Sequence, residues 1–336
     1  MDIINKKIKV AQYGTQHGHA ASVLSTMLAN PFVDVAGVYE PDIDIRNSLI
    51  KDSTYPWNSV TFFKNVNDLF AKDIFAVASE GSNIQSLQHT YDLLENGKHV
   101  FYDKPAGDNF ALFSQCIELA KKKNLYLQMG YMFRNHSGFQ IIADIVKSNR
   151  LGIIHSIRAH MSTKIQEPMR KQISSHKGGI FFDLAGHMID QIVYLLGSPN
   201  KITSFIRKDF TLTPNFSDNC LSVFEYENAL AFIDISSNEP PPLARRFEVY
   251  GSKGSLIMEP FEPAQTVRVN IPSENPSEVY LQVKDYATSF TSSDTARYSE
   301  GFSDFINVIT NDIPPRRTYE HEIAVQETLL KAVGLI

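Results

Sequence analysis

The sequence predicts a two-domain α/β protein, with a doubly wound parallel sheet in its first part and a mostly antiparallel sheet in its second. Three observations predict this fold class. The chain has 336 residues, enough for about two domains, and 43% of them are hydrophobic, so each domain can bury a full core. Short β-branched runs alternate with helical stretches in the first half, whereas strand signals follow one another in the second.

The first half contains five apolar runs that we expect to be strands: 8–13, 33–39, 74–78, 100–102 and 126–129. Helical periodicity predicts the helices between them, at 23–28, from Asp42 onward, at 87–95 and at 110–123. Strands separated by helices of this length form right-handed βαβ units and a parallel sheet. We therefore expect a first domain, built on a doubly wound parallel sheet, over residues 1–129.

The second half begins with helices expected at 139–147 and 179–196. The expected strands then follow at 202–206, 220–226, 230–235, 247–250, 255–258, 267–269 and 279–283. Gly251 to Gly254 is a hairpin signal, and Pro240 to Pro242 indicates a loop. Helices at 297–310 and 319–333 close the chain. These elements predict a second α+β domain over 130–336, with a large, mostly antiparallel open sheet.

Composition excludes several classes of protein. The net charge is −5, without the basic excess that nucleic acid or an anionic membrane requires of a partner. Two cysteines without a CxxC spacing indicate no disulfide framework and no zinc-binding knuckle. The N-terminal decapeptide lacks an apolar signal core, and residues 11–33 are too polar for a membrane span. We expect a cytoplasmic protein.

The first strand leads into a glycine turn at the start of a helix, where a dinucleotide pyrophosphate would meet a helix N-terminus. Of the glycine positions 14, 16 and 19 that a strict G-x-G-x-x-G requires, only Gly14 is present. The turn is therefore either a cofactor contact or the simple end of a strand. As cofactor contacts we expect Gly14, Thr15, Gln16 and His17.

Glu40, at the end of the second strand, favours NAD over NADP. An acid at this distance from the glycine turn can bond both ribose hydroxyls, and its charge repels a 2′-phosphate. The alternative is an ordinary exposed acid in a loop. His17 and His19, with no carboxylate at matching sequence spacing, are expected to contact backbone or cofactor rather than a metal ion.

Two further segments carry catalytic residue types. Lys104 follows a strand and precedes Pro105, which places an ammonium at the sheet edge where ligands of such folds bind. Asp183 and His187 are at i and i+4 and so share a helix face, where a carboxylate beside an imidazole suits proton exchange near neutral pH. The alternatives are a surface lysine and a histidine satisfied within the core.

Together these motifs resemble the glucose-fructose oxidoreductase, inositol 2-dehydrogenase and rhizopine catabolism (Gfo/Idh/MocA) family of oxidoreductases. The matching segments occur in the family's order, at 97–105, 130–134, 178–190, 195–197 and 251–256. The resemblance implies an N-terminal Rossmann domain that binds NAD(P). It also implies a C-terminal α/β domain whose open sheet often forms a homodimer or homotetramer interface.

The resemblance also implies roles for single residues. Lys104 would bond the nicotinamide ribose and the substrate hydroxyl, Asp183 would hold substrate, and His187 would exchange the hydroxyl proton. Ser79 and Arg134 are further implied cofactor contacts. Arg170 and His176, just before the Gly-Gly entry of the helix, could bind substrate hydroxyls or a carboxylate.

The chain departs from the family's pattern in several places. Asp103 stands where the family usually has Glu, Met169 stands where it often has Trp, and the stretch from Ser79 to Ser86 lacks its usual His. Substrate identity therefore does not transfer from the family to this chain.

The sequence thus predicts an NAD-dependent oxidoreductase that acts on a secondary alcohol of a sugar, cyclitol or related polyol. Two alternatives stay open. One is a glycoside hydrolase that uses tightly bound NAD for a transient oxidation and elimination. The other is a non-catalytic sugar or nucleotide sensor, whose signature would be loss of Lys104 or His187, and both residues are present.

Overall fold

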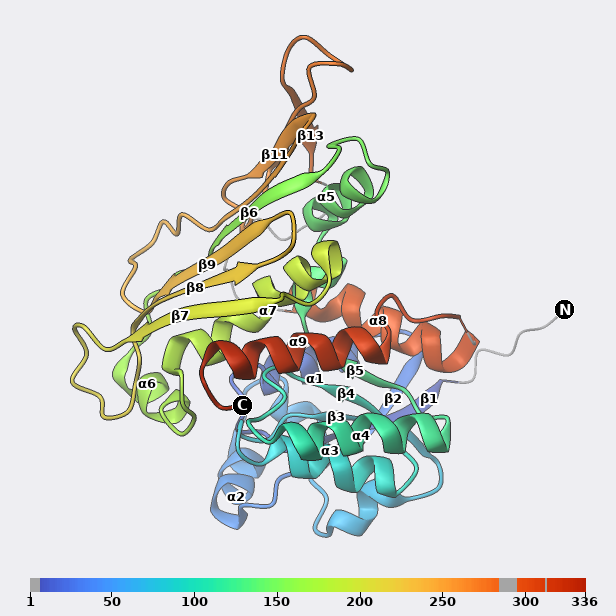
Figure 1. The fold of residues 1–336 in the computed structure, drawn as a ribbon. Helices are drawn as coiled ribbons and strands as arrows, with labels where there is room; N and C mark the ends of the chain where they lie inside the picture. The colour runs from blue at the N-terminus through green and yellow to red at the C-terminus, as the bar shows by residue number, and fades with distance from the viewer. Residues whose placement is uncertain (1–6, 284–294, 312) are drawn as a thin grey trace, which may run out of the picture. The chain divides into compact units, whose positions relative to one another are not determined.

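The computed structural model describes residues 7–283, 295–311 and 313–336 (Figure 1). The first six residues, part of the decapeptide in which we expect no signal segment, lie outside the described residues. The chain divides into two compact units. Unit 1 contains Met1–Gly130 and Thr291–Tyr319, and unit 2 contains Tyr131–Phe290 and Glu320–Ile336.

Unit 1 is built on a five-stranded sheet in which every neighbouring pair is parallel. Its strands, in spatial order, are β2 (Val33–Tyr39), β1 (Ile8–Tyr13), β3 (Ile74–Ser79), β4 (His99–Tyr102) and β5 (Leu127–Met129). The order reverses between β1 and β3, which is where open α/β sheets bind ligands, beyond the carboxyl ends of the strands. The expected doubly wound parallel sheet is confirmed.

Unit 1 contains five helices among the described residues. They are α1 (Ala20–Ala29), α2 (Ile43–Lys51), α3 (Ser86–Glu95), α4 (Phe110–Lys123) and α8 (Thr295–Asn311), with two 3₁₀ turns at Trp57–Ser59 and Val66–Phe70. Asp42 accepts from the backbone N–H groups of Asp44 and Ile45, and Asn109 accepts from that of Leu112. No side chain caps the N-terminus of α1 or of α3.

Helix α8 belongs to unit 1, although we expected its residues in a second domain over 130–336. Its Phe302 and Phe305 rings are buried, and each has its centroid 5.7 Å from that of Phe101 in β4. Tyr319 ends the segment and binds the backbone of the loop before β5, donating to Leu125 O and accepting from Leu127 N. Burial of these rings, rather than sequence proximity, decides where α8 packs.

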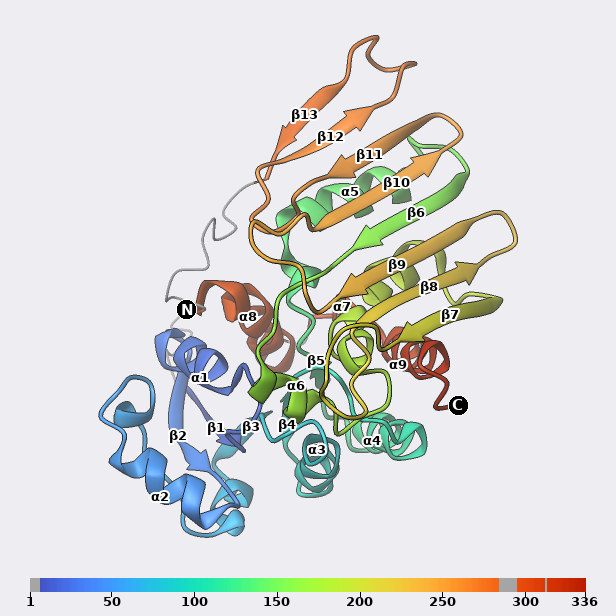
Figure 2. The same cartoon turned by 90° about the vertical axis from the view of Figure 1, so that its left-hand side faces the viewer.

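Unit 2 contains an eight-stranded sheet that is antiparallel except between β6 and β9 (Figure 2). Its strands, in spatial order, are β13 (Val279–Gln282), β12 (Thr266–Asn270), β11 (Gly254–Met258), β10 (Arg246–Gly251), β6 (Ile154–His160), β9 (Leu230–Ser236), β8 (Asn219–Glu225) and β7 (Lys201–Arg207). Gly251 pairs with Gly254 at the expected hairpin. The expected large, mostly antiparallel sheet is confirmed.

Helices cover one face of this sheet (Figures 1 and 2). They include α5 (Ser137–Lys147), which contacts β12, and α7 (Gly179–Leu196), which contacts β8 and β9. The short helix α6 (Glu167–Ile173), the 3₁₀ turn η3 (Met132–Asn135) and the last helix α9 (Tyr319–Ala332) complete the unit. By length and composition α7 alone among the described helices could cross a membrane, but 72% of it is buried within the protein, as in a core helix.

Sequence analysis missed two elements of unit 2, β6 and α6. β6 is the central strand of the sheet, yet its polar and apolar residues only partly alternate, and Ile157 and Ala159 are its buried side chains. α6 is short and carries Pro168 in its first turn. Neither segment offers a sustained period, and tertiary pairing on both edges stabilises β6.

Candidate functional site

The turn between β1 and α1 is held close to the turn after β3. Gly14 has a φ of +86°, and its N–H donates to the carbonyl of Tyr39. A Cβ at position 14 would lie 2.5 Å from the backbone of Gly81. Only glycine fits this position, because it has neither the strain nor the clash of a side chain. The uncapped N-terminus of α1 follows, with backbone N–H groups suited to an anionic pyrophosphate.

Glu40 is buried at the end of β2 and binds the glycine turn itself. Its carboxylate accepts hydrogen bonds from the backbone and hydroxyl of Thr15, at 2.9 and 2.6 Å, and from the side-chain amide of Gln16, at 3.1 Å. It also accepts from the backbone of Asp42. Glu40 is thus not an ordinary exposed acid. A ribose contact would have to exchange one of these internal bonds, so that role stays a prediction.

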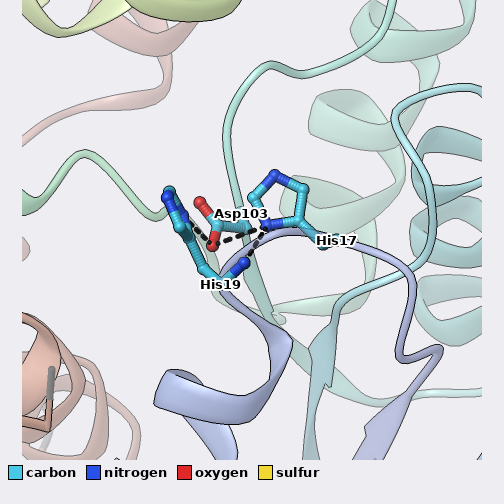
Figure 3. Close-up of side chains that lie close together, drawn as sticks. All are labelled: His17, His19 and Asp103. Atoms are coloured by element: carbon cyan, nitrogen blue, oxygen red, sulfur yellow. Dashed lines mark hydrogen bonds and ion pairs between the residues drawn. The ribbon is translucent and has the colours of Figure 1, made fainter. Parts of the chain in front are cut away.

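His17, His19 and Asp103 lie together at the carboxyl ends of β1 and β4 (Figure 3). The Oδ2 atom of Asp103 is 3.2 Å from Nδ1 of His17 and 2.9 Å from Nδ1 of His19. Glu80, directly after β3, approaches the same His17 atom to 3.5 Å with Oε2. We call these four residues the His–carboxylate cluster. The four residues follow three different strands, β1, β3 and β4, whose carboxyl ends meet at one edge of the parallel sheet.

Burial and charge shift the pKa values in this cluster. Burial alone would lower the pKa of His17, but Asp103 and Glu80 raise it to about 10. Burial and the neighbouring Asp103 charge raise the pKa of Glu80 to about 8. Burial also opposes ionisation of Asp103, but the two imidazoles hold its pKa well below the ordinary value. Near neutral pH the raised pKa values place protons on His17 and Glu80, which balance the buried carboxylate of Asp103.

Lys104 is buried at this edge of the sheet, 4% exposed, so it is not a surface lysine. Its backbone is fixed by the cluster, since its N–H donates to Oδ1 of Asp103 at 2.7 Å and its carbonyl lies 3.0 Å from Nε2 of His17. Ser79, an expected cofactor contact, is buried, and its hydroxyl donates to Ser86 O and accepts from Thr90. These internal bonds do not support a cofactor contact by the Ser79 side chain.

In unit 2 the expected pair of Asp183 and His187 lies on α7, which begins after Gly178 with a φ of +99°. Asp183 is half-buried and His187 is buried. The His187 ring meets Tyr131 and Phe133 edge-on, with centroids 5.7 and 5.2 Å away. These aromatic walls fix the imidazole on its helix face, as a positioned acid–base group requires.

The side chain of Arg134, which we expected to contact the cofactor, is bound by carboxylates within unit 2. Its Nε and Nη2 donate to Oδ1 of Asp190, at 3.0 and 2.6 Å, and Nη1 and Nη2 donate to Glu322 at 2.6 and 2.7 Å. His321 also lies 2.8 Å from the same Asp190 oxygen. This buried network joins η3, α7 and α9, and each nitrogen of the guanidinium is used within unit 2.

Two further expected substrate residues of unit 2, His176 and Arg170, precede α7. His176 is 3% exposed and lines a cavity of about 670 Å³, and its ring lies 4.9 Å from that of Phe182. Lys177 and Lys208 also line this cavity. Arg170 is half-buried on α6, where Nη1 donates to the hydroxyl of Thr211 at 3.3 Å. Sugar hydroxyls or an anion would suit such a lining.

Sequence reasoning missed Glu80 and the partners of the two turn histidines. Both Glu80 and Asp103 directly follow expected strands of one parallel sheet, so their convergence with the turn after β1 could have been inferred from that signal. The network of Arg134 with Glu322 has no comparable signal, because 188 residues separate its two members.

Comparisons with known proteins identify both parts of the chain. The model of the oxidoreductase family with an NAD-binding Rossmann fold matches residues 8–131, and that of the GFO/IDH/MocA C-terminal domain matches 139–257. The oxidoreductase YrbE of Bacillus subtilis is 29% identical over 52% of each chain. Myo-inositol 2-dehydrogenase of Thermotoga maritima is 25% identical over 65% of this chain and 64% of its own. The aligned region spans about half to two thirds of the length of these curated relatives.

A solved structure shares the fold over nearly the whole chain. GenD2 from gentamicin A biosynthesis, crystallised in complex with NAD, superposes with a TM-score of 0.80 at 17% identity, over 99% of this chain and 94% of its own. At this identity the likeness concerns the fold alone. The glycine turn, the uncapped α1 N-terminus and the acid after β2 in this chain fit a dinucleotide.

Proposed function

This chain belongs to the Gfo/Idh/MocA family of oxidoreductases, and from that premise we propose that it transfers a hydride between NAD and a secondary alcohol of a sugar, cyclitol or related polyol. The observation that carries the proposal is the pair of Asp183 and His187 on one face of α7, in the unit that follows the NAD-binding domain. The relative named myo-inositol 2-dehydrogenase supports a polyol as substrate.

The chain's own residues would divide the chemistry as follows. When bound, NAD would supply the acceptor for the hydride that leaves the carbon bearing the hydroxyl. Lys104 would hold the reacting hydroxyl, Asp183 would bind a further substrate hydroxyl, and His187 would take the hydroxyl proton at a ring nitrogen. The backbone N–H groups at the start of α1 would hold the pyrophosphate, and Glu40 would disfavour a 2′-phosphate by its charge.

We further propose that the protein acts in the cytoplasm as a homodimer or homotetramer, joined through the sheet of unit 2. One face of that sheet carries no helix (Figure 2). Phe205 in β7, which is 55% exposed, and half-buried Phe232 in β9 alternate with the more buried side chains of their strands and so lie on the opposite face from them. Such a face suits a second copy of the chain. Light scattering on the purified protein would give the mass, and a monomer would contradict this proposal.

The central test separates cofactor binding from chemistry. Purified protein is titrated with NADH and with NADPH by fluorescence, and then assayed for NADH formation with a panel of polyols. We expect tighter binding of NADH. His187→Gln should lower kcat by about 10²–10⁴-fold, the usual contribution of a general base, with NADH binding unchanged. Lys104→Met should also lower turnover strongly while the fold is retained.

The matched control is His155→Gln, which removes an exposed imidazole from unit 2 and should leave turnover unchanged. Normal turnover in His187→Gln would contradict the role assigned to it. If no polyol yields NADH and denatured protein releases NAD, the hydrolase alternative gains support instead. If neither dinucleotide binds and none is released, the sensor alternative gains support.

A further inference from the structure

We propose that His17, His19, Asp103 and Glu80 form a binding site for one divalent transition-metal ion of the Zn²⁺ class. The site lies in unit 1, at the glycine turn assigned to the dinucleotide, and its test does not require hydride transfer. Two imidazole nitrogens and two carboxylates are a donor set typical of Zn²⁺ and related ions.

The ligand atoms already lie at suitable separations. With metal–ligand bonds of about 2.0–2.1 Å, tetrahedral geometry places neighbouring ligand atoms about 3.3 Å apart. Oδ2 of Asp103 lies 3.2 and 2.9 Å from the Nδ1 atoms of His17 and His19, and the three ligand atoms lie within 4.8 Å of one another (Figure 3). Glu80, whose Oε2 atom lies 3.5 Å from Nδ1 of His17, would have to move toward these three atoms to become the fourth ligand.

The tautomer of His17 supports a metal at Nδ1. Its Nε2 atom is 3.0 Å from the carbonyl oxygen of Lys104, and a carbonyl can only accept, so Nε2 carries the hydrogen. Nδ1 is then the nitrogen that faces oxygens of Asp103 and Glu80, at 3.2 and 3.5 Å, and it also lies 3.2 Å from the backbone N–H of His19, a contact that a bound ion would replace. Two carboxylate oxygens so close to this nitrogen require a positive charge there, either a proton on Nδ1 or a bound ion.

The surroundings of the cluster match those of a ligand shell. Metal-binding histidines commonly donate their other N–H to a backbone carbonyl, as His17 does here. Asp103 is oriented in the same way, because its second oxygen accepts from the backbone N–H of Lys104 at 2.7 Å. The orienting contacts of His17 Nε2 and Asp103 Oδ1 leave Oδ2 of Asp103 facing the site, whereas Nδ1 of His17 would exchange its contact with the backbone N–H of His19 for the ion.

Glu80 places a buried carboxylate beside His17. Its side chain is fully buried, and neither carboxylate oxygen has a hydrogen-bond partner among the described residues. A buried carboxylate is costly unless a cation or a proton compensates it, and among the described residues Glu80 has only the ion-pair contact with His17, at 3.5 Å. Its Oε2 atom points at the same Nδ1 of His17 that the other ligands surround.

The site is reachable from solvent and unusual for a glycine turn. The His19 side chain is 28% exposed, so an ion has an entry path past it. His19 stands where the dinucleotide fingerprint has glycine, and Asp103 stands where family members usually have Glu. Two departures from the pattern therefore meet at one point, as a second ligand function would require.

The test is metal binding by the full chain, measured without any cofactor. Protein stripped with chelator is titrated with Zn²⁺ by calorimetry and with Co²⁺ by visible absorption. We expect one equivalent of each ion and the intense bands of four-coordinate Co²⁺. His19→Ala should weaken binding by more than about 100-fold, since even outer-shell partners change metal affinity by about 10–100-fold. His155→Ala, which removes an exposed imidazole, should bind like the wild type.

Glu80→Gln and Asp103→Asn test the carboxylates, and circular dichroism checks that each variant folds. His19→Ala keeps the test decisive if a buried variant fails to fold, because His19 is the most accessible ligand. The proposal is overturned if the wild type binds no ion, or if His19→Ala binds Zn²⁺ as tightly as the wild type. In that case a proton on His17 supplies the charge. Neither result depends on NADH binding, so this proposal and the proposed function fail separately.

Discussion

At the scale of single residues, Gly14 and Gly97 separate two effects that usually act together. Both have a positive φ, +86° and +74°. A Cβ on Gly14 would collide with the backbone of Gly81, whereas a Cβ on Gly97 would meet nothing within 4 Å. The pair therefore distinguishes the steric requirement of the turn from the cost of left-handed backbone alone.

We expect Gly97→Ala to lower the free energy of unfolding by about 1 kcal/mol, through backbone strain only. Gly14→Ala should cost more, at least about 3 kcal/mol, because the turn must also move away from Gly81. It should weaken NADH binding as well. Urea unfolding and NADH titration of both variants measure this. Equal losses in the two variants would show that the contact with Gly81 is unimportant.

Arg134 illustrates how a buried charge depends on its partners. Its side chain is 5% exposed and bound to Asp190 and Glu322. Arg134→Met leaves two buried carboxylates without their counter-ion, so we expect a loss of about 3–5 kcal/mol in stability. Arg150, whose side chain and that of its partner Glu274 are each 41% exposed, is the control. Arg150→Met should change stability by less than about 1 kcal/mol in denaturant unfolding. Similar losses in the two variants would contradict this account of Arg134.

At the scale of elements, α8 is the clearest case of an element placed by packing. The helix follows the strands of unit 2 in sequence but packs within unit 1, against α1 and β4. Phe305 contacts three aromatic rings there, those of Phe101, Tyr126 and Phe302. The apolar face of α8 is therefore part of the core of unit 1.

Phe305→Ala should destabilise unit 1 by about 3–5 kcal/mol, the usual cost of a large cavity in an aromatic core. Phe32→Ala is the matched control in the same unit, because Phe32 is 60% exposed, and it should change stability by about 0.5 kcal/mol or less. Hydrogen exchange of β4 and β5 locates the effect. Unchanged protection of these strands in Phe305→Ala would contradict the role of α8.

At the scale of the whole molecule, buried neutral histidines govern acid stability. Burial lowers the pKa of His89, His99 and His136 to about 4, below the value of 6.5 in an unfolded chain. Between these values the unfolded chain binds more protons at these three residues than the folded one, so their contribution to stability is complete above pH 6.5 and is lost as the pH decreases toward 4. Glu80, with its pKa raised to about 8, opposes this change but is one group against three.

We therefore expect the urea midpoint to decrease from pH 6.5 to pH 4. His89 stacks on Tyr13 at 3.8 Å, so His89→Phe keeps the stacking and should make this decrease shallower. His155→Phe, which alters an exposed imidazole, should leave the slope as it is. A wild-type midpoint that does not fall over this range would refute the explanation.

Local patterns were sufficient for most elements. The five strands of unit 1, the long apolar helix α7 and the hairpin at Gly251 follow from periodicity and turn residues, because these signals lie within a few neighbouring residues. β6 escaped this reasoning, since its stability comes from pairing with β9 and β10 on either side. The motif segments also sufficed to identify the family, which the comparisons confirm.

The sequence by itself therefore determined the fold class, the order of strands and helices and the family. Only the tertiary structure decided which distant side chains meet. Glu80 and Asp103 reach His17 because parallel strands end at one edge of the sheet, although 63 and 86 residues separate them along the chain. Arg134 is bound by Asp190 and Glu322 for a similar reason, since burial requires counter-ions that the fold brings from other helices.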